Sequence, residues 1–172
     1  SALECEPDAY LTKPFNRASL QQRLDKLVER KLALKPILDA LTRHDQKAVL
    51  AACGQIMEDN KRFVPQCQRY KAGALKALGK HAELESMLAE LIADRPMPWA
   101  LVLLGNHWLD RGELDKAEEL FTSAISQFPM LPALFDGLAA VHAARGATDK
   151  AQDYLEQGLR ISPHSLQRQH EL

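Results

Sequence analysis

Hydrophobic residues recur three or four positions apart through most of this chain, the spacing that places them on one face of a helix. The apolar runs end at glycine or proline, which mark helix ends. Between residues 98 and 163 the same order of apolar, glycine and proline positions occurs twice. The pattern predicts short helices joined by tight turns, with two helices in each copy.

The two copies keep one fixed offset at each matched position, so that Pro98 recurs as Pro132 and Pro129 as Pro163. In the 98–131 copy, Pro98 starts a first helix, because proline fits the first helical turn. Arg111-Gly112 ends that helix, and a second helix runs to Pro129. A fixed period of this length is typical of stacked helical repeats. Small residues are expected where the two helices cross, namely at Gly105, Ala117 and Ala124.

These positions resemble the tetratricopeptide repeat. The first copy carries that family's apolar, aromatic, small and proline positions at Leu101, Leu104-Gly105, Trp108, Ala117, Phe121, Ala124 and Pro129. In the second copy, His142 replaces the expected aromatic residue, and a packed histidine is expected there rather than a metal ligand. The resemblance implies an all-α fold: a right-handed superhelical array of helix-turn-helix repeats (an α-solenoid), in which the first helix of each repeat lines a concave groove.

The repeat pattern extends less regularly over residues 34–172. We expect a degenerate repeat, three further repeats and a capping helix, at 34–62, 65–97, 98–131, 132–163 and 164–172. In the degenerate repeat, His44-Asp45 makes the turn that glycine makes elsewhere, and a second helix begins near Gln46. Its expected apolar residues are Ala48, Ala51, Ala52, Ile56 and Met57.

Residues 1–33 do not follow the repeat. A short strand is expected before Lys13-Pro14-Phe15, and Asn16 is a suitable N-cap for a helix from Arg17 to about Ala33. The apolar side of this helix carries Leu20, Leu24, Leu27 and Val28. Its expected solvent side carries Arg23, Lys26, Arg30 and Lys31.

The run Asp8–Phe15 and the helix after it resemble the last strand and last helix of a response-regulator receiver domain. The resemblance implies a phosphoryl contact for Lys13, a cis bond before Pro14 and a switch-reporting role for Tyr10. The phospho-acceptor part of that domain is missing from this chain, so these residues alone form no phosphoryl site. We expect residues 1–15 to be disordered or to pair with a second copy of the chain, so that residues 1–33 could support self-association.

Composition narrows the functional classes. The net charge of −1 does not favour nucleic acid as a partner, although residues 12–35 hold seven basic residues against two acidic ones, which keeps nucleic-acid binding as a weaker hypothesis. No apolar run is long enough for a membrane span. The three cysteines have no paired spacing, which is typical of reduced thiols in the cytoplasm.

The sequence carries no recognisable catalytic or cofactor motif. None of its six histidines has the spacing of a metal site, and there is no glycine-rich phosphate loop. We therefore expect no enzyme, no cofactor and no metal. By analogy with the repeat family, a protein or peptide would bind the groove formed by first helices, at residues that include Arg69, Lys76, Trp99, Asn106 and Asp136.

Two functional hypotheses follow. The whole order of elements resembles a bacterial family in which a receiver domain precedes a tetratricopeptide array. The chain would then be the output module of a two-component response regulator, with partner binding controlled by phosphorylation of the receiver. The alternative is a free-standing scaffold or assembly adaptor without a phosphorelay role.

Overall fold

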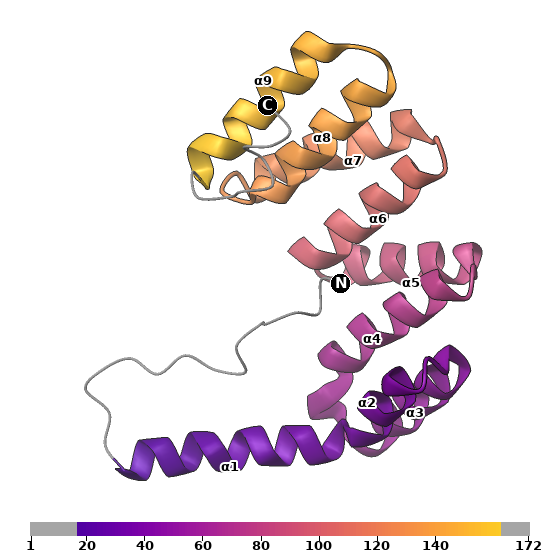
Figure 1. Cartoon of the computed structure of the whole chain (residues 1–172), viewed down its shortest axis with the longest axis vertical. Coiled ribbons are helices and arrows are strands. Elements are labelled where there is room, and N and C mark those ends of the chain that lie inside the picture. The colour runs from indigo at the N-terminus through magenta and orange to yellow at the C-terminus, as the bar shows by residue number, and fades with distance from the viewer. Residues whose placement is uncertain (1–16, 163–172) are drawn as a thin grey trace. The chain divides into compact units, whose positions relative to one another are not determined.

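The structure, a computed structural model, describes residues 17–162, and this part of the chain is built of helices and turns (Figure 1). The expected all-α class is confirmed. The elements are α1 (Arg17–Ala33), α2 (Lys35–Thr42), α3 (Gln46–Asp59), the 3-10 helix η1 (Lys61–Phe63), α4 (Val64–Ala77), α5 (His81–Asp94), α6 (Pro98–Asp110), α7 (Leu114–Gln127), α8 (Pro132–Ala144) and α9 (Thr148–Ile161).

Two predicted segments lie outside the described residues. One is the strand before Lys13, together with Tyr10, Pro14 and the order of residues 1–15; the other is the capping helix at 164–172. The helix predicted from Arg17 to about Ala33 is present as α1.

The chain forms two compact units, one ending at His81 and the other beginning at Ala82; they are called unit 1 and unit 2. In unit 2 the helices begin at the same positions of each sequence repeat. Pro98 and Pro132, which match in the sequence repeat, are the first residues of α6 and α8, and α7 and α9 begin at the same offset from each other. Each of α7, α8 and α9 packs against the helix before it.

The core of unit 2 is centred on Phe121 of α7, whose side chain is fully buried. Gly105 on α6 and Gly137 on α8 both face its ring. A Cβ atom at either glycine would overlap that ring, so the missing side chains make room for it. The small residue expected at position 105 is therefore needed for a specific reason: the Phe121 ring packs directly against the backbone of α6 at Gly105 and of α8 at Gly137.

The turns between helices share one backbone geometry. Gly79, Gly112 and Gly146 have φ values of +67°, +75° and +75°, in the left-handed region that glycine adopts easily. His44 has a φ of +55° in the turn between α2 and α3. The α2–α3 turn thus uses a histidine, at a steric cost, where the later turns, including the turn after α4 in unit 1, use glycine.

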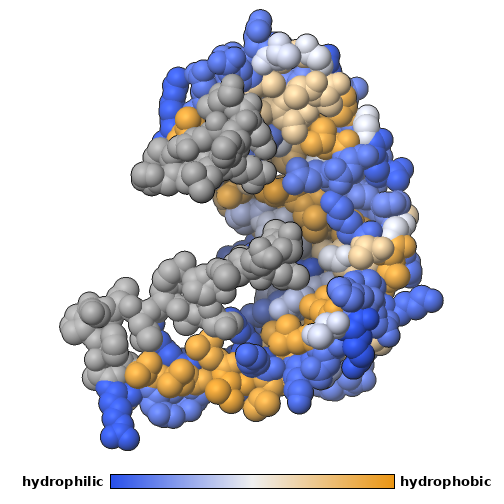
Figure 2. Space-filling view, in the orientation of Figure 1, coloured by the Kyte–Doolittle hydropathy of each residue, from blue (hydrophilic) through white to orange (hydrophobic). Residues whose placement is uncertain are grey.

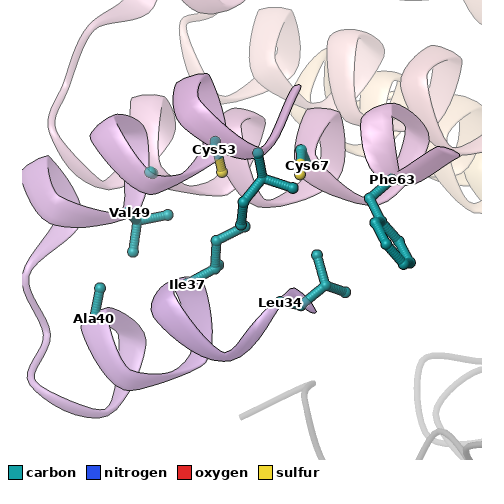
Figure 3. Packing of buried hydrophobic residues seen from close by; sticks show 9 residues of the cluster. Leu34, Ile37, Ala40, Val49, Cys53, Phe63 and Cys67 are labelled. Carbon is teal, nitrogen blue, oxygen red and sulfur yellow. The ribbon is translucent and has the colours of Figure 1, made fainter. Parts of the chain in front are cut away.

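Unit 1 has its own core, formed where α2, α3 and α4 meet (Figure 3). Ile37, Val49, Cys53 and Cys67 are fully buried in it. The predicted apolar face of α3 was partly wrong: Ala51 is exposed, and the buried side of the helix carries Val49, Cys53 and Ile56. These three residues are four and three positions apart, the spacing of one helix face. The helix begins after Asp45, whose side chain caps it by accepting a 3.0 Å hydrogen bond from the Ala48 N–H.

The prediction for α1 was also partly wrong. Leu24 and Val28, expected on a packed face, are 45% and 55% exposed, and Leu32 beside them is 65% exposed. Figure 2 shows hydrophobic surface along this helix. On the side expected to face solvent, Arg23 and Lys26 are exposed as predicted and Arg30 is half-buried, and all three line a groove against η1 and the start of α4.

Candidate functional site

Helices α6 and α8 are neighbours in unit 2, and each carries one row of side chains that are not fully buried, although Val102 and Leu109 of α6 pack in part against the unit's core. The two rows occupy matching positions of successive repeats, because the period fixes the rotation of both helices. We call them the α6–α8 face. Its members are Val102, Asn106 and Leu109 on α6 and Asp136, Ala140 and Ala143 on α8.

The chemistry of the α6–α8 face suits a polypeptide ligand. Val102, Leu109 and the two alanines supply apolar contact area. The amide of Asn106 can both donate and accept hydrogen bonds, and the carboxylate of Asp136 can accept them. Such a mixture can bind the backbone of a peptide while apolar side chains add affinity.

The predicted groove residues divide between the two units. Trp99, Asn106 and Asp136 lie in unit 2, where all three are half-buried, on the first turn of α6, on α6 and on α8. Arg69 and Lys76 are exposed on α4 in unit 1. The structure therefore brings Asn106 and Asp136 onto neighbouring helices, whereas a shared groove with Arg69 and Lys76 stays a prediction.

A polar contact links successive repeats and was not visible in the sequence. The Trp108 Nε1–H on α6 donates a 3.0 Å hydrogen bond to Glu85 Oε1 on α5. One repeat later, His142 Nε2 on α8 lies 3.5 Å from Glu118 Oε1 on α7. Glu118 and His142 follow Glu85 and Trp108 by one repeat each, so the same pairing recurs with a different ring.

The surroundings of His142 explain why it replaces an aromatic residue. Its side chain is 6% exposed, and its ring stacks on that of Tyr154 with centroids 5.3 Å apart. This confirms the expectation of a packed histidine. Trp108 has a comparable neighbour in Lys116, whose Nζ lies 5.7 Å from the ring centroid.

Charged side chains around α7 strengthen these links. Arg145 donates hydrogen bonds to Glu118 and, at 2.5 Å, to Asp115. The hydrogen bond from Arg145 lowers the pKa of Glu118 and in turn raises the pKa of Arg145. In the turn just before α7, hydrogen bonds from Lys116 and Arg111, at 2.6 and 2.9 Å, lower the pKa of Glu113. Arg145, which directly follows α8, thus links that helix to α7, whereas the pairs of Glu113 are local to the α6–α7 turn.

The cysteines of unit 1 form a pair that sequence reasoning missed. Cys53 of α3 and Cys67 of α4 are reduced, fully buried and in hydrogen-bonding contact (Figure 3). Burial, and then the neighbouring Cys67, raise the pKa of Cys53 to about 12, while burial also raises the pKa of Cys67. Thiols with raised pKa values are poor nucleophiles, so the pair serves packing. The available signal was helical spacing, since Cys53 lies between Val49 and Ile56 on one face.

Neither a metal-binding cluster nor a membrane-spanning helix is found among the described residues. Residues 17–162 contain no group of three or more His, Cys, Asp or Glu side chains arranged to hold a metal ion. Over the same range, each helix is too short or too polar to cross a membrane.

The sequence matches no family model and no curated protein. Among solved structures, the fold is similar to that of a protein described as "MamA RS-1 ArsTM double mutant", with a TM-score of 0.63 and 15% sequence identity. The similarity covers 83% of this chain and 80% of that one. MamA contains tetratricopeptide repeats. At this identity the likeness shows the fold alone: the chain has a tetratricopeptide-like fold of helical repeats.

Proposed function

We propose that this protein is a protein-binding module whose α6–α8 face takes a peptide segment of a partner. The proposal rests on the two matching rows of incompletely buried side chains on α6 and α8. Each of these helices is also joined to the helix before it by a polar contact, Trp108 with Glu85 and His142 with Glu118. Apolar side chains with an interspersed amide and carboxylate are what a peptide backbone with hydrophobic anchors requires.

Site-specific crosslinking in the native cell tests this proposal. A photoreactive amino acid is placed at Ala140, at the centre of the face, and at Gln152, an exposed position of α9, as the matched control. The proposal expects a discrete crosslinked protein from position 140 that position 152 does not give. Equal patterns at the two positions would show that the face is not a binding site.

We further propose that the module is the output part of a two-component response regulator in the bacterial cytoplasm, with partner binding controlled by phosphorylation of a receiver domain. The resemblance of Asp8–Phe15 to a receiver strand supports this, as does the helix that follows it. The exposed Leu24, Val28 and Leu32 on α1 also support it, since a receiver's last helix needs an apolar side to pack on its sheet.

The intact mass of the protein isolated from its native cell separates this proposal from the adaptor alternative. A mass above 19.2 kDa by a domain of on the order of 100 residues supports the receiver. Phosphorylation of that longer protein should then change the crosslinking yield at position 140, because control requires two states with different affinities. A mass near 19.2 kDa would instead favour a free-standing scaffold.

A further inference from the structure

Unit 1 contains a groove that the proposed function does not use. Its volume is about 340 Å³, and it lies between α1 on one side and η1 with the start of α4 on the other. The α1 wall consists of Arg23, Lys26, Leu27 and Arg30, and the opposite wall of Arg62, Phe63 and Gln66. The groove belongs to a different unit from the α6–α8 face, and the two share no residue.

Four of the seven residues that line the groove are basic: Arg23, Lys26, Arg30 and Arg62. Arg62 is bonded to an acidic side chain of α1, Glu29, whose two carboxylate oxygens each accept a 2.8 Å hydrogen bond from Arg62 Nη1. Both members of that pair are about half exposed, so a carboxylate from another molecule can exchange with Glu29 at little cost. The groove therefore favours an anionic occupant.

The apolar residues of the groove narrow the kind of anion. Leu27, which is half-buried, lies among the basic side chains, whereas Phe63 is almost fully buried, with the Arg62 guanidinium 5.6 Å from its ring centroid. A small inorganic anion or a phosphate chain would leave this apolar area uncovered. A peptide with acidic and apolar side chains would cover it while pairing with the arginines.

Gln66 adds a hydrogen-bonding requirement. Its Oε1 is buried and has no hydrogen-bond partner, which is a costly condition for a polar atom. Turned toward the groove, this oxygen would accept a bond from an N–H donor. A peptide backbone provides such donors along its whole length, whereas a phosphate group provides none.

We propose that this groove is a docking site for an acidic peptide segment of a partner protein, with a carboxylate that replaces Glu29 on Arg62 and an apolar side chain against Leu27. The proposal is independent of the α6–α8 face. The net charge of −1 and the carboxylate of Glu29 beside Arg62 disfavour nucleic acid as the occupant.

The test is fluorescence anisotropy on the full chain at physiological salt, with a labelled short peptide in which Glu alternates with Leu and Phe. The double substitution Arg23→Glu and Lys26→Glu should weaken binding at least about tenfold, because charge-assisted hydrogen bonds are lost and like charges meet. The matched control is Arg43→Glu with Lys47→Glu, the same charge change on exposed positions of unit 1 outside the groove; it should bind the peptide like the parent. Gln66→Leu should weaken binding about threefold or more, without reversing any charge.

Several outcomes would overturn the proposal. They are the absence of peptide binding at millimolar concentration, an equal loss in the groove and control variants, and tighter binding of single-stranded DNA than of the peptide. Concentration-dependent self-association that Arg23→Glu abolishes would assign the groove to a second copy of the chain. Peptide binding that appears only after residues 1–16 are removed would assign it to the chain's own acidic segment, which contains Glu4, Glu6 and Asp8.

Discussion

Units 1 and 2 solve the same packing problem in different ways. In unit 2, residues one period apart do the same structural work, with proline at the start of α6 and α8 and glycine at the turn that ends each of them. In unit 1, His44 occupies the left-handed position of the α2–α3 turn, whereas Gly79 occupies that position after α4, and Cys53 and Cys67 lie together in the core. A regular period thus predicts where the helices lie and which residues start them, form their turns and fill their core. In an irregular segment these residues have to be identified one by one.

The distribution of tryptophan makes this comparison measurable. Both tryptophans of the chain, Trp99 and Trp108, lie in unit 2. Tryptophan fluorescence therefore reports the unfolding of unit 2, whereas far-ultraviolet circular dichroism reports the helices of both units. Each prediction below uses this difference.

The largest expected effect is at the aromatic residue on which unit 2 is centred. Phe121→Ala should lower the free energy of unfolding of unit 2 by about 3–5 kcal/mol, because it removes a fully buried ring and leaves a cavity between two glycines. Urea unfolding followed by tryptophan fluorescence measures it. A loss below about 1 kcal/mol would show that the ring is not central to the core.

The glycine beside that ring should give the next largest effect. Gly105→Ala should destabilise unit 2 by about 1–3 kcal/mol, since the added Cβ overlaps the Phe121 ring. In the Phe121→Ala background the same change should be neutral or stabilising, because alanine is the better helix former once the ring is gone. Additive effects of the two changes would contradict the proposed contact. Gly73→Ala on α4 of unit 1, where nothing lies within 4 Å, is the control for an added Cβ without overlap, followed by circular dichroism.

The α6–α7 turn and the α2–α3 turn should respond to substitution in opposite directions. Gly112→Ala should cost about 1 kcal/mol, because alanine is strained at a φ of +75°. His44→Gly should instead stabilise unit 1 by about 0.5–1 kcal/mol by relieving the same strain. The first change should shift the fluorescence transition, and the second the circular dichroism signal without the fluorescence transition. Loss of stability in the histidine variant would mean that its side chain contributes more than the turn strain costs.

The smallest expected effect concerns the ion pair between repeats. The pKa of Glu118 is lowered in the folded state, so its stabilising contribution is fully present above its unfolded pKa, about 4.3, and is lost as the pH falls through the folded pKa. Glu118→Gln should therefore cost about 0.5–1 kcal/mol at neutral pH, a modest value because both side chains are about one-third exposed. The difference from the parent should disappear toward low pH. Glu119→Gln, at the exposed neighbouring position, is the matched control for the loss of one carboxylate.

Much of the fold was predictable because helical spacing and turn residues act locally. Pro98 and Pro132 placed the first residues of α6 and α8, since proline fixes a helical φ, and the glycine just past each helix placed its end approximately, since glycine adopts the left-handed turn easily. The helix from Arg17 to Ala33 followed from its N-cap and apolar spacing in the same way. In the degenerate repeat the turn at His44 was predicted correctly. The buried side of α3 was predicted only in part, because Ala51 was expected on it and is exposed.

The candidate sites were predictable only in part. The position of Asn106 and Asp136 on matching rows of α6 and α8 followed from the repeat, because a fixed period repeats the rotation of each helix. The polar contacts of Trp108 and His142 with glutamates did not, since each joins residues of two different helices that are far apart in the sequence. The groove between α1 and η1 was equally hidden, because it exists only once Arg23 and Arg62 are brought to the same place.

The sequence by itself determined the helices, their turns and the period that stacks them, since each depends on residues within a few positions of one another. Only the tertiary structure decided which side of each helix is covered. It buried Cys53 against Cys67, left Leu24 and Val28 exposed, and turned the basic side of α1 into one wall of a groove. The physical reason is that burial depends on which other surfaces a helix meets, and a helix with apolar and basic sides can pack in more than one way.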